Sequence, residues 1–321
     1  MRTRIFGTGS ALPKRKVTND DLGKIMDTSD DWIKSRTGIC ARHLAVEENL
    51  TELAAKAASQ ALEEAGILPE QLDMILGATL SADKILPSLS CELQRELGAV
   101  NAVAFDINAA CSGFLFALQT ADVYIRCGQY SKILIVGGEI LSKMMDWNDR
   151  STCVLFGDGA GAAVAAADEN CGILSSIQGS NGTKGEVLLC ENRENNNPYV
   201  KGKQTFSYVS MNGQEVYKFA VRTVPNAIVK AVEKAGLTIE DIDLFLLHQA
   251  NIRIIESVSK RLNVPMEKFP TNLEECGNIS AGSVPILLDY VNRRGMLKKG
   301  SRIVLAGFGA GLTWGASVLS W

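Results

Sequence analysis

The sequence predicts an α/β protein, a layered sandwich made of two duplicated halves related by a pseudo-two-fold axis. Amphipathic helices alternate with short apolar strands along all 321 residues, as in sheets that are covered by helices. Residues 61–77 and 231–247 are identical at seven of seventeen positions, at an offset of 170. The same offset pairs residues 131–137 with 301–307. Segments that share one offset indicate an internal duplication.

We therefore expect an N-terminal half at residues 1–170 and a C-terminal half at residues 171–321. The offset also pairs Asn108 with Asn278, so the chain around Cys111 has a counterpart in the second half. Ligand sites of such sheets lie beyond the strand ends, where equivalent helices meet. Both junctions should therefore face one central region.

Local patterns predict the individual elements of the first half. Residues 50–66 form an amphipathic helix pattern that stops at Gly66, and residues 132–137 form an apolar run typical of a strand covered on both faces. The remaining predicted elements are strands at 2–12, 74–78 and 102–107 and helices at 19–26 and 90–97.

The glycine-rich stretch 157–164 predicts a turn that leads into a strand. It is not a phosphate-binding loop, because no Lys-Ser/Thr pair follows it. Residues 186–204 are polar and predict a surface loop, whereas residues 244–247 predict a buried strand.

Composition excludes several classes of function. A net charge of −3 gives no overall field for nucleic acid, and no apolar run is long enough for a membrane span. The eight cysteines contain no C-x-x-C pair and no signal peptide precedes them, so we expect a reduced, cytoplasmic chain. Two histidines are too few for a histidine-based metal site, and we expect no metal.

Cys111 is the first candidate for chemistry. It lies between an apolar run that ends at Ile107 and a helix pattern that begins near Phe114. The free N–H groups and the dipole of a helix N-terminus favour a thiolate. By itself the pattern favours an inert buried cysteine over a reactive one.

His248 and Asn278 are the second and third candidates. His248 directly follows the strand at 244–247, where catalytic groups tend to emerge, and Asn278 precedes a further helix. Alone, the imidazole could be a half-buried structural group and the amide a helix cap. Their places at corresponding sheet ends favour one shared site with Cys111.

Five motifs in order along the chain carry a family resemblance. They are residues 108–114, 156–161, 248–251, 277–281 and 307–315. With these motifs the whole chain resembles the β-ketoacyl-acyl-carrier-protein synthase III family, the thiolase-like condensing enzymes that initiate bacterial fatty-acid synthesis. The resemblance implies a thiolase-like α-β-α-β-α sandwich. It also implies decarboxylative Claisen condensation of a short acyl-CoA, acetyl-CoA or a branched relative, with malonyl-carrier protein, through an acyl-cysteine intermediate.

The resemblance also implies the catalytic roles. Cys111 would carry the acyl group, and the backbone N–H groups of Cys111 and Ala310 would form the oxyanion hole. Ala310 stands in a loop that is richer in glycine in the family, although a backbone donor survives this change. His248 and Asn278 would stabilise the enolate formed by decarboxylation, and Phe308 would help to shape their pocket.

Further residues are assigned to substrate by the same resemblance. Trp32 and Arg150 would flank the CoA adenine, Arg36 would pair with a CoA phosphate, and Asn251 would lie along the pantetheine tunnel. Leu86 would cap the acyl pocket of the partner subunit in a homodimer. Many relatives have Phe at this position, so a Leu puts the choice of primer in doubt.

Acyl carrier protein and acyl-CoA are the implied partners. Lys218, Arg253 and Lys260 match a basic patch that receives the acidic carrier protein. Acyl-CoA would be a substrate, so no cofactor is expected, and neither nucleic acid nor a membrane is an expected partner.

Three alternatives stand beside this interpretation. A related thiolase-fold condensing enzyme or acyltransferase of secondary metabolism would share the fold, but the basic patch and the His-Asn pair favour the first function. A hydroxymethylglutaryl-CoA synthase uses a glutamate base, and no matching glutamate is found. A silent scaffold is disfavoured by the intact Cys-His-Asn set.

Overall fold

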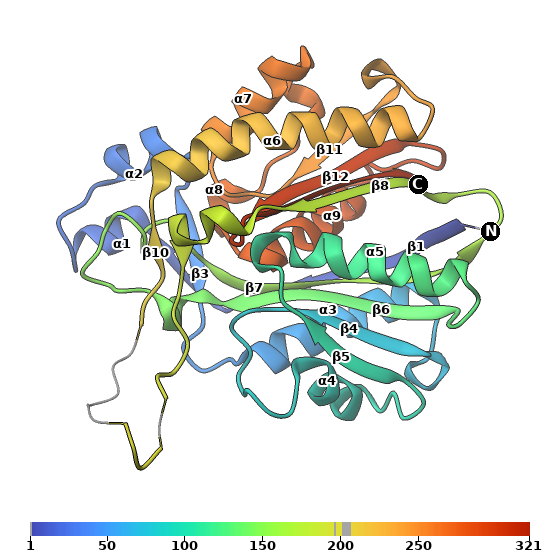
Figure 1. Cartoon of the computed structure of the whole chain (residues 1–321), viewed down its shortest axis with the longest axis horizontal. Helices are drawn as coiled ribbons and strands as arrows, with labels where there is room; N and C mark the ends of the chain where they lie inside the picture. The colour runs from blue at the N-terminus through green and yellow to red at the C-terminus, as the bar shows by residue number, and fades with distance from the viewer. Residues whose placement is uncertain (1, 196, 201–206) are drawn as a thin grey trace.

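The structure is a computed structural model that describes residues 2–195, 197–200 and 207–321. Figure 1 shows five layers, with helices on both outer faces, two sheets, and the helices α5 (Gly113–Arg126) and α9 (Ser283–Arg293) between the sheets. Both middle helices contact both sheets. The predicted α-β-α-β-α sandwich of two duplicated halves is therefore confirmed.

The first sheet has the strand order β1-β7-β6-β4-β5. Strand β4 runs parallel to β5 and β6, whereas β7 is antiparallel to both β6 and β1. Helix α3 packs on β1, β6 and β7, and α4 packs on β4 and β5. The bounds are β1 Arg2–Ala11, β4 Met74–Ala78, β5 Val103–Ile107, β6 Lys132–Ile140, β7 Asp158–Asp168, α3 Leu50–Ala65 and α4 Leu89–Leu97.

The second sheet repeats this arrangement with the order β11-β12-β13-β8. Strand β11 is parallel to β12, and β13 is antiparallel to both β12 and β8, as for β4, β6, β7 and β1. Helix α6 covers this sheet and packs against α7. The bounds are β8 Gly172–Ser180, β11 Leu244–Leu247, β12 Arg302–Gly309, β13 Thr313–Ser320, α6 Gly213–Lys234 and α7 Ile252–Leu262.

Glycine residues in β6 and β7 allow the middle layer to approach the first sheet closely. A Cβ atom on Gly137 of β6 would lie 2.3 Å from the carbonyl oxygen of Ala281. A Cβ atom on Gly161 of β7 would lie 2.6 Å from the backbone nitrogen of Ile286. Any larger residue would therefore push α9 away from the sheet.

Local signals set the helix bounds as the sequence indicated. Asn49 caps α3 by accepting a hydrogen bond from the N–H of Glu52, and Gly66 ends the helix with a φ of 63°. The predicted helix at 19–26 is shorter than expected: α1 ends at Gly23.

The remaining elements are short and lie around the two sheets. Besides α1 (Asn19–Gly23), they are α2 Asp30–Thr37, α8 Leu273–Cys276, β2 Arg15–Thr18, β3 Ala41–Leu44, β9 Leu188–Leu189, β10 Ser210–Met211 and the 3₁₀ turns η1 Pro69–Gln71, η2 Ala110–Ser112, η3 Leu141–Met144, η4 Gly182–Val187, η5 Ile239–Asp241, η6 Met266–Lys268 and η7 Ser280–Gly282.

The predicted surface loop at 186–204 is wrong at its start. This stretch begins with the end of η4 and with β9, which pairs with β10, and its side chains line a cavity. Residues 196 and 201–204 of the prediction lie outside the described residues. Within the described part of the chain, no helix is long and apolar enough to span a membrane.

Candidate active site

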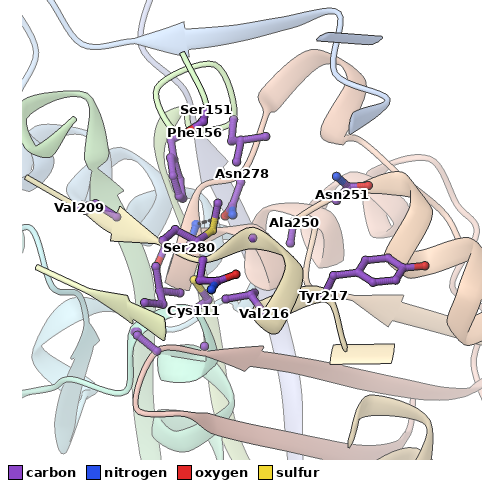
Figure 2. Close-up of a pocket in the computed structure, with 18 of the residues that line it drawn as sticks. Cys111, Ser151, Phe156, Val209, Val216, Tyr217, Ala250, Asn251, Asn278 and Ser280 are labelled. Carbon is purple, nitrogen blue, oxygen red and sulfur yellow. Dashed lines mark hydrogen bonds between the residues drawn. The ribbon is translucent and has the colours of Figure 1, made fainter. Parts of the chain in front are cut away.

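One cavity of about 1210 Å³, at the ends of β11 and β12, is lined by most of the candidate residues. Figure 2 shows Cys111, Ser280 and Asn278 close together in it, with Asn251 further along. Predicted site residues that line this cavity are Trp32, Arg36, Cys111, His248, Asn251, Arg253, Asn278, Phe308 and Ala310.

Cys111 lies in η2, the short turn that leads directly into α5 at Gly113. The turn starts at Ala110, which has a φ of 46°, an uncommon conformation for a residue with a side chain. The carboxamide oxygen of Asn108 accepts the N–H of Ala110 at 3.2 Å and supports this conformation. The prediction of a strand-to-helix junction is thus confirmed.

Asn278 stands in the equivalent turn of the second half. Its Oδ1 accepts the N–H of Ser280 at 2.8 Å, and Ser280 also has a φ of 46°. Its backbone N–H donates to Leu155 at 2.9 Å, and its carbonyl accepts the N–H of Gly157 at 3.0 Å. Because Oδ1 is occupied, the Nδ2 group of Asn278 is left as the donor for a ligand in the cavity.

His248 is held at the end of β11 by the bond from its N–H to the carbonyl of Ala306, at 2.8 Å. Its ring is edge-on to Phe308, with the centroids 5.5 Å apart. Burial lowers the pKa of His248 to about 3, so the imidazole is neutral at physiological pH. Among the described residues its Nδ1 has no partner, and the proton is better placed on Nε2 as a donor.

The loop after β12 is fixed against η2 through Thr313. The Thr313 hydroxyl bonds to the carbonyls of Ala109 at 3.2 Å and Ala310 at 3.0 Å, and it lies 2.6 Å from the Ser112 hydroxyl. This network sets the position of Ala310 relative to the nucleophile loop.

The expected low pKa of Cys111 is wrong for the structure. The pKa of the thiol is raised to about 12, chiefly by desolvation and also by the nearby carboxylate of Glu139, while Ser280 acts in the opposite direction. The helix N-terminus alone therefore does not hold a thiolate.

Trp32, Arg36 and Arg150 gather at the mouth of the cavity. The guanidinium groups of Arg36 and Arg150 lie 4.7 Å and 5.1 Å from the centre of the Trp32 ring. Arg150 also pairs with Asp27 at 3.2 Å. Asn251 joins this group by donating from Nδ2 to the carbonyl of Arg36 at 3.0 Å.

Four predicted residues do not line this cavity: Leu86, Lys218, Lys260 and Arg150, which packs on Trp32. Leu86 is 84% exposed and Lys260 is exposed on α7. Lys218 lines a second cavity and pairs with Glu215 at 2.9 Å. Arg253 lines the main cavity and donates to the carbonyl of Ser35 at 2.7 Å, so it also holds α7 to α2.

Sequence reasoning missed Glu139, which is 0% exposed in β6 and influences Cys111. The missed signal is a carboxylate within an apolar strand, a residue type that is rarely fully buried without a role. Glu139 belongs to none of the five motifs that carry the family resemblance.

The five-layer fold and a cavity that joins a cysteine, a neutral histidine and an asparagine define a condensing enzyme of the thiolase fold. Sequence models of two parts of one family match the chain: 3-oxoacyl-[acyl-carrier-protein] synthase III at residues 105–182, and its C-terminal part at residues 232–321. The chain belongs to this family of acyltransferases.

Individual relatives agree over nearly the full length. The β-ketoacyl-[acyl-carrier-protein] synthase III of Clostridium acetobutylicum is 50% identical over 99% of this chain and 98% of its own length. The structure of the synthase III of Aquifex aeolicus superposes with a TM-score of 0.94, with 45% identity, over 99% of this chain and 100% of its own. The priming β-ketosynthase of the R1128 polyketide pathway is also similar, with a TM-score of 0.92 and 35% identity, over 99% of this chain and 96% of its own.

Gly309→Ala should disturb the nucleophile loop. An added Cβ atom would lie 2.7 Å from the backbone nitrogen of Cys111 and 3.0 Å from that of Ser112. We expect a loss of about 1–3 kcal/mol in unfolding free energy and acylation that is about 10- to 100-fold slower. Denaturant unfolding and labelling by an acyl-CoA measure both. Gly182→Ala, where nothing lies within 4 Å of the added atom, is the control, and acylation of Gly309→Ala at the rate of this control would contradict the assignment.

Proposed function

We propose that this chain initiates type II fatty-acid synthesis by condensing a short acyl-CoA with malonyl-acyl-carrier-protein to give 3-oxoacyl-carrier protein, CoA and CO₂. The observation that carries the proposal is the shared cavity of Cys111, His248 and Asn278 in a chain of this family. Acyl-CoA acts as a substrate, and the reaction needs no cofactor.

In the first half-reaction, the Cys111 sulfur attacks the thioester carbonyl of acyl-CoA, and the CoA thiolate leaves. The backbone N–H groups of Cys111 and Ala310 stabilise the oxyanion. The approach of Gly309 to the Cys111 nitrogen supports this pairing, because it brings the two loops together.

In the second half-reaction, His248 and Asn278 donate hydrogen bonds to the malonyl thioester oxygen. Loss of CO₂ leaves an enolate, which attacks the acyl group on Cys111. The occupied Oδ1 of Asn278 and the low pKa of His248 support this role, because both side chains are then neutral donors.

The mouth of the cavity receives the nucleotide part of CoA. Trp32 and Arg150 hold the adenine between them and Arg36 pairs with a phosphate. Arg150 lies over the Trp32 ring and pairs with Asp27. Its guanidinium group therefore has to move away from Trp32 to make room for the adenine ring between them. Asn251 contacts the pantetheine arm deeper in the cavity.

The active assembly is a homodimer formed along β5. This strand is an edge of its sheet, and Val103 at its start is 46% exposed. Ile85 and Leu86 are 68% and 84% exposed in the loop before α4, the helix that packs on β5. Unpaired edge groups beside exposed apolar side chains favour association, and the second copy places Leu86 at the partner's acyl pocket. Each chain comprises the halves 1–170 and 171–321.

A second candidate function is the priming of a polyketide. The similarity to the R1128 priming β-ketosynthase favours it, and it differs in the downstream carrier protein rather than in the chemistry of Cys111. Comparing a fatty-acid carrier protein with a polyketide carrier protein as malonyl donors distinguishes the two.

Separate assays of the two half-reactions test the proposed function. Cys111→Ser should take up no label from radiolabelled acetyl-CoA, because a hydroxyl has a far higher pKa than a thiol. His248→Ala and Asn278→Ala should be labelled, yet condense about 100-fold more slowly or worse. Undiminished condensation by Cys111→Ser, or equal losses in both assays for the other two variants, would contradict the roles.

Charge reversal at Lys260 tests the docking of the carrier protein. Lys260→Glu should raise KM for malonyl-carrier protein, more strongly at low salt, and leave acyl-CoA labelling unchanged. Lys260 is preferred to Arg253, because Arg253 also holds α7 to α2. Lys299→Glu is the matched control. Lys299 is exposed just before the first residue of β12, whereas the cavity lies at the last residues of that strand. A KM that does not respond to the Lys260 change would remove this residue from the docking surface.

Leu86→Phe tests the acyl pocket. A larger, planar side chain should narrow the primer range toward acetyl-CoA, changing the preference by about 1–3 kcal/mol per methylene at most. The ratio of kcat/KM for acetyl-CoA and isobutyryl-CoA measures this. Val46→Phe, another exposed position, serves as the control, and an unchanged ratio in Leu86→Phe would mean that Leu86 does not limit the primer.

A further inference from the structure

Glu139 is a buried carboxyl group for which the condensation mechanism above has no use. It lies in β6 with 0% exposure and influences the Cys111 thiol directly. A carboxyl group at this depth is costly unless its oxygens are hydrogen-bonded. Its two oxygens, however, differ sharply in their partners.

Oε2 of Glu139 is saturated, whereas Oε1 is free. Oε2 accepts hydrogen bonds from the hydroxyls of Thr79 and Ser81 and from the N–H of Leu80. Within the described chain, Oε1 is buried without a partner. One oxygen therefore anchors the group, and the other is available to hold a proton.

Ser280 lies between this carboxyl group and the nucleophile. It belongs to η7, which packs against both η2 and β6, and Figure 2 shows it beside Cys111. Its hydroxyl lowers the pKa of both Cys111 and Glu139. It is buried and, like Oε1, has no hydrogen-bond partner among the described residues. The φ of 46° and the bond from its N–H to Asn278 hold Ser280 in this unusual orientation.

The second half lacks both the nucleophile and the carboxyl group, although it supplies Ser280. At the offset of 170, Ala281 replaces Cys111, Gly309 replaces Glu139, and Ala110 stands where the second half has Ser280. The backbone turn itself is kept, since Ala110 and Ser280 share the same φ. The carboxyl group thus occurs only in the half that carries the cysteine, and the hydroxyl comes from the other half.

The other charged groups around Glu139 do not substitute for it. Burial lowers the pKa of Lys143 in η3. The charges of Asp83, Glu139 and Asp158 act in the opposite direction, so Lys143 is shared among three carboxylates. Asp158 of β7 is occupied by bonds from Ala45 and Ser142.

We propose that Glu139 is a positioning residue that activates Cys111 through Ser280. The S–H bond of Cys111 breaks as its proton passes to the Ser280 oxygen, and the Ser280 proton passes to Oε1 of Glu139. The thiolate then forms its C–S bond to the acyl group, and the C–S bond to CoA breaks. The proton returns along the same path to the CoA sulfur. The inference rests on the proposed acyl-transfer function.

This path removes the charge penalty of forming a thiolate in the cavity. Transfer within the pair keeps its net charge constant, whereas loss of the proton to water would place two anions side by side. Neutral His248, with a pKa of about 3, is a poor acceptor, while burial raises the pKa of Glu139 to about 7. Above about pH 7 the carboxylate can accept the proton, and below it the site is already protonated.

Alkylation of Cys111 by iodoacetamide tests the path without requiring condensation. The rate is followed on the full chain between about pH 5 and pH 9 through the mass of the Cys111 peptide. The wild-type rate should rise through about pH 7 and then level off. Glu139→Gln and Ser280→Ala should lose this inflection and react about 10-fold more slowly at about pH 7.5. Glu92→Gln, another buried glutamate, which does not line the cavity, should keep the wild-type profile.

Two outcomes would overturn the proposal. If Glu139 acts only through its charge, Glu139→Gln lowers the pKa of Cys111 and alkylation becomes faster; if its role is structural, the profile does not change. Thermal melting checks the folding of each variant, and Ser280→Ala decides the question should Glu139→Gln fail to fold. A wild-type chain that takes no label from acyl-CoA but keeps the inflection would reject the proposed function and leave the path standing.

Discussion

The close backbone contact between η2 and η7 is the constraint on which the site depends. These two turns touch at the centre of the molecule, where α5 and α9 begin. The second turn and its helix pack closely on the first sheet because Gly137 presents no side chain to Ala281 of η7 and Gly161 presents none to α9. Since each turn carries or adjoins a candidate group, Cys111 or Asn278, the packing of the middle layer fixes the geometry of the cavity.

The duplication supplies a symmetric frame, and the chemistry comes from its asymmetry. Asn108 and Asn278 are both kept, because each accepts the N–H two residues further on and stabilises the same strained turn. Around that frame one half has His248 where the other has Ala78, and Phe308 where the other has Gly138. Small residues on one side leave the room that the functional side chains occupy.

Much of this could be predicted from the sequence, because periodicity and offset report local structure and symmetry. The strand before His248 and the junction at Cys111 both follow from apolar runs that end at polar residues. Three features could not be predicted: the pKa of Cys111, the packing of Arg150 on Trp32 and the approach of Glu139. Each depends on side chains from segments far apart in the sequence, whose distances and desolvation no local pattern contains.

Unpaired buried atoms around Cys111 connect these features. Within the described chain, Nδ1 of His248, Oγ of Ser280 and Oε1 of Glu139 are all buried without hydrogen-bond partners. Each such atom costs about 1–3 kcal/mol, so three together represent a substantial loss of folding stability. A low dielectric strengthens the interactions of any charge that forms inside the site and makes an isolated thiolate unfavourable. The same burial that keeps His248 a neutral donor for the enolate therefore leaves the nucleophile in need of a proton acceptor within the cavity wall.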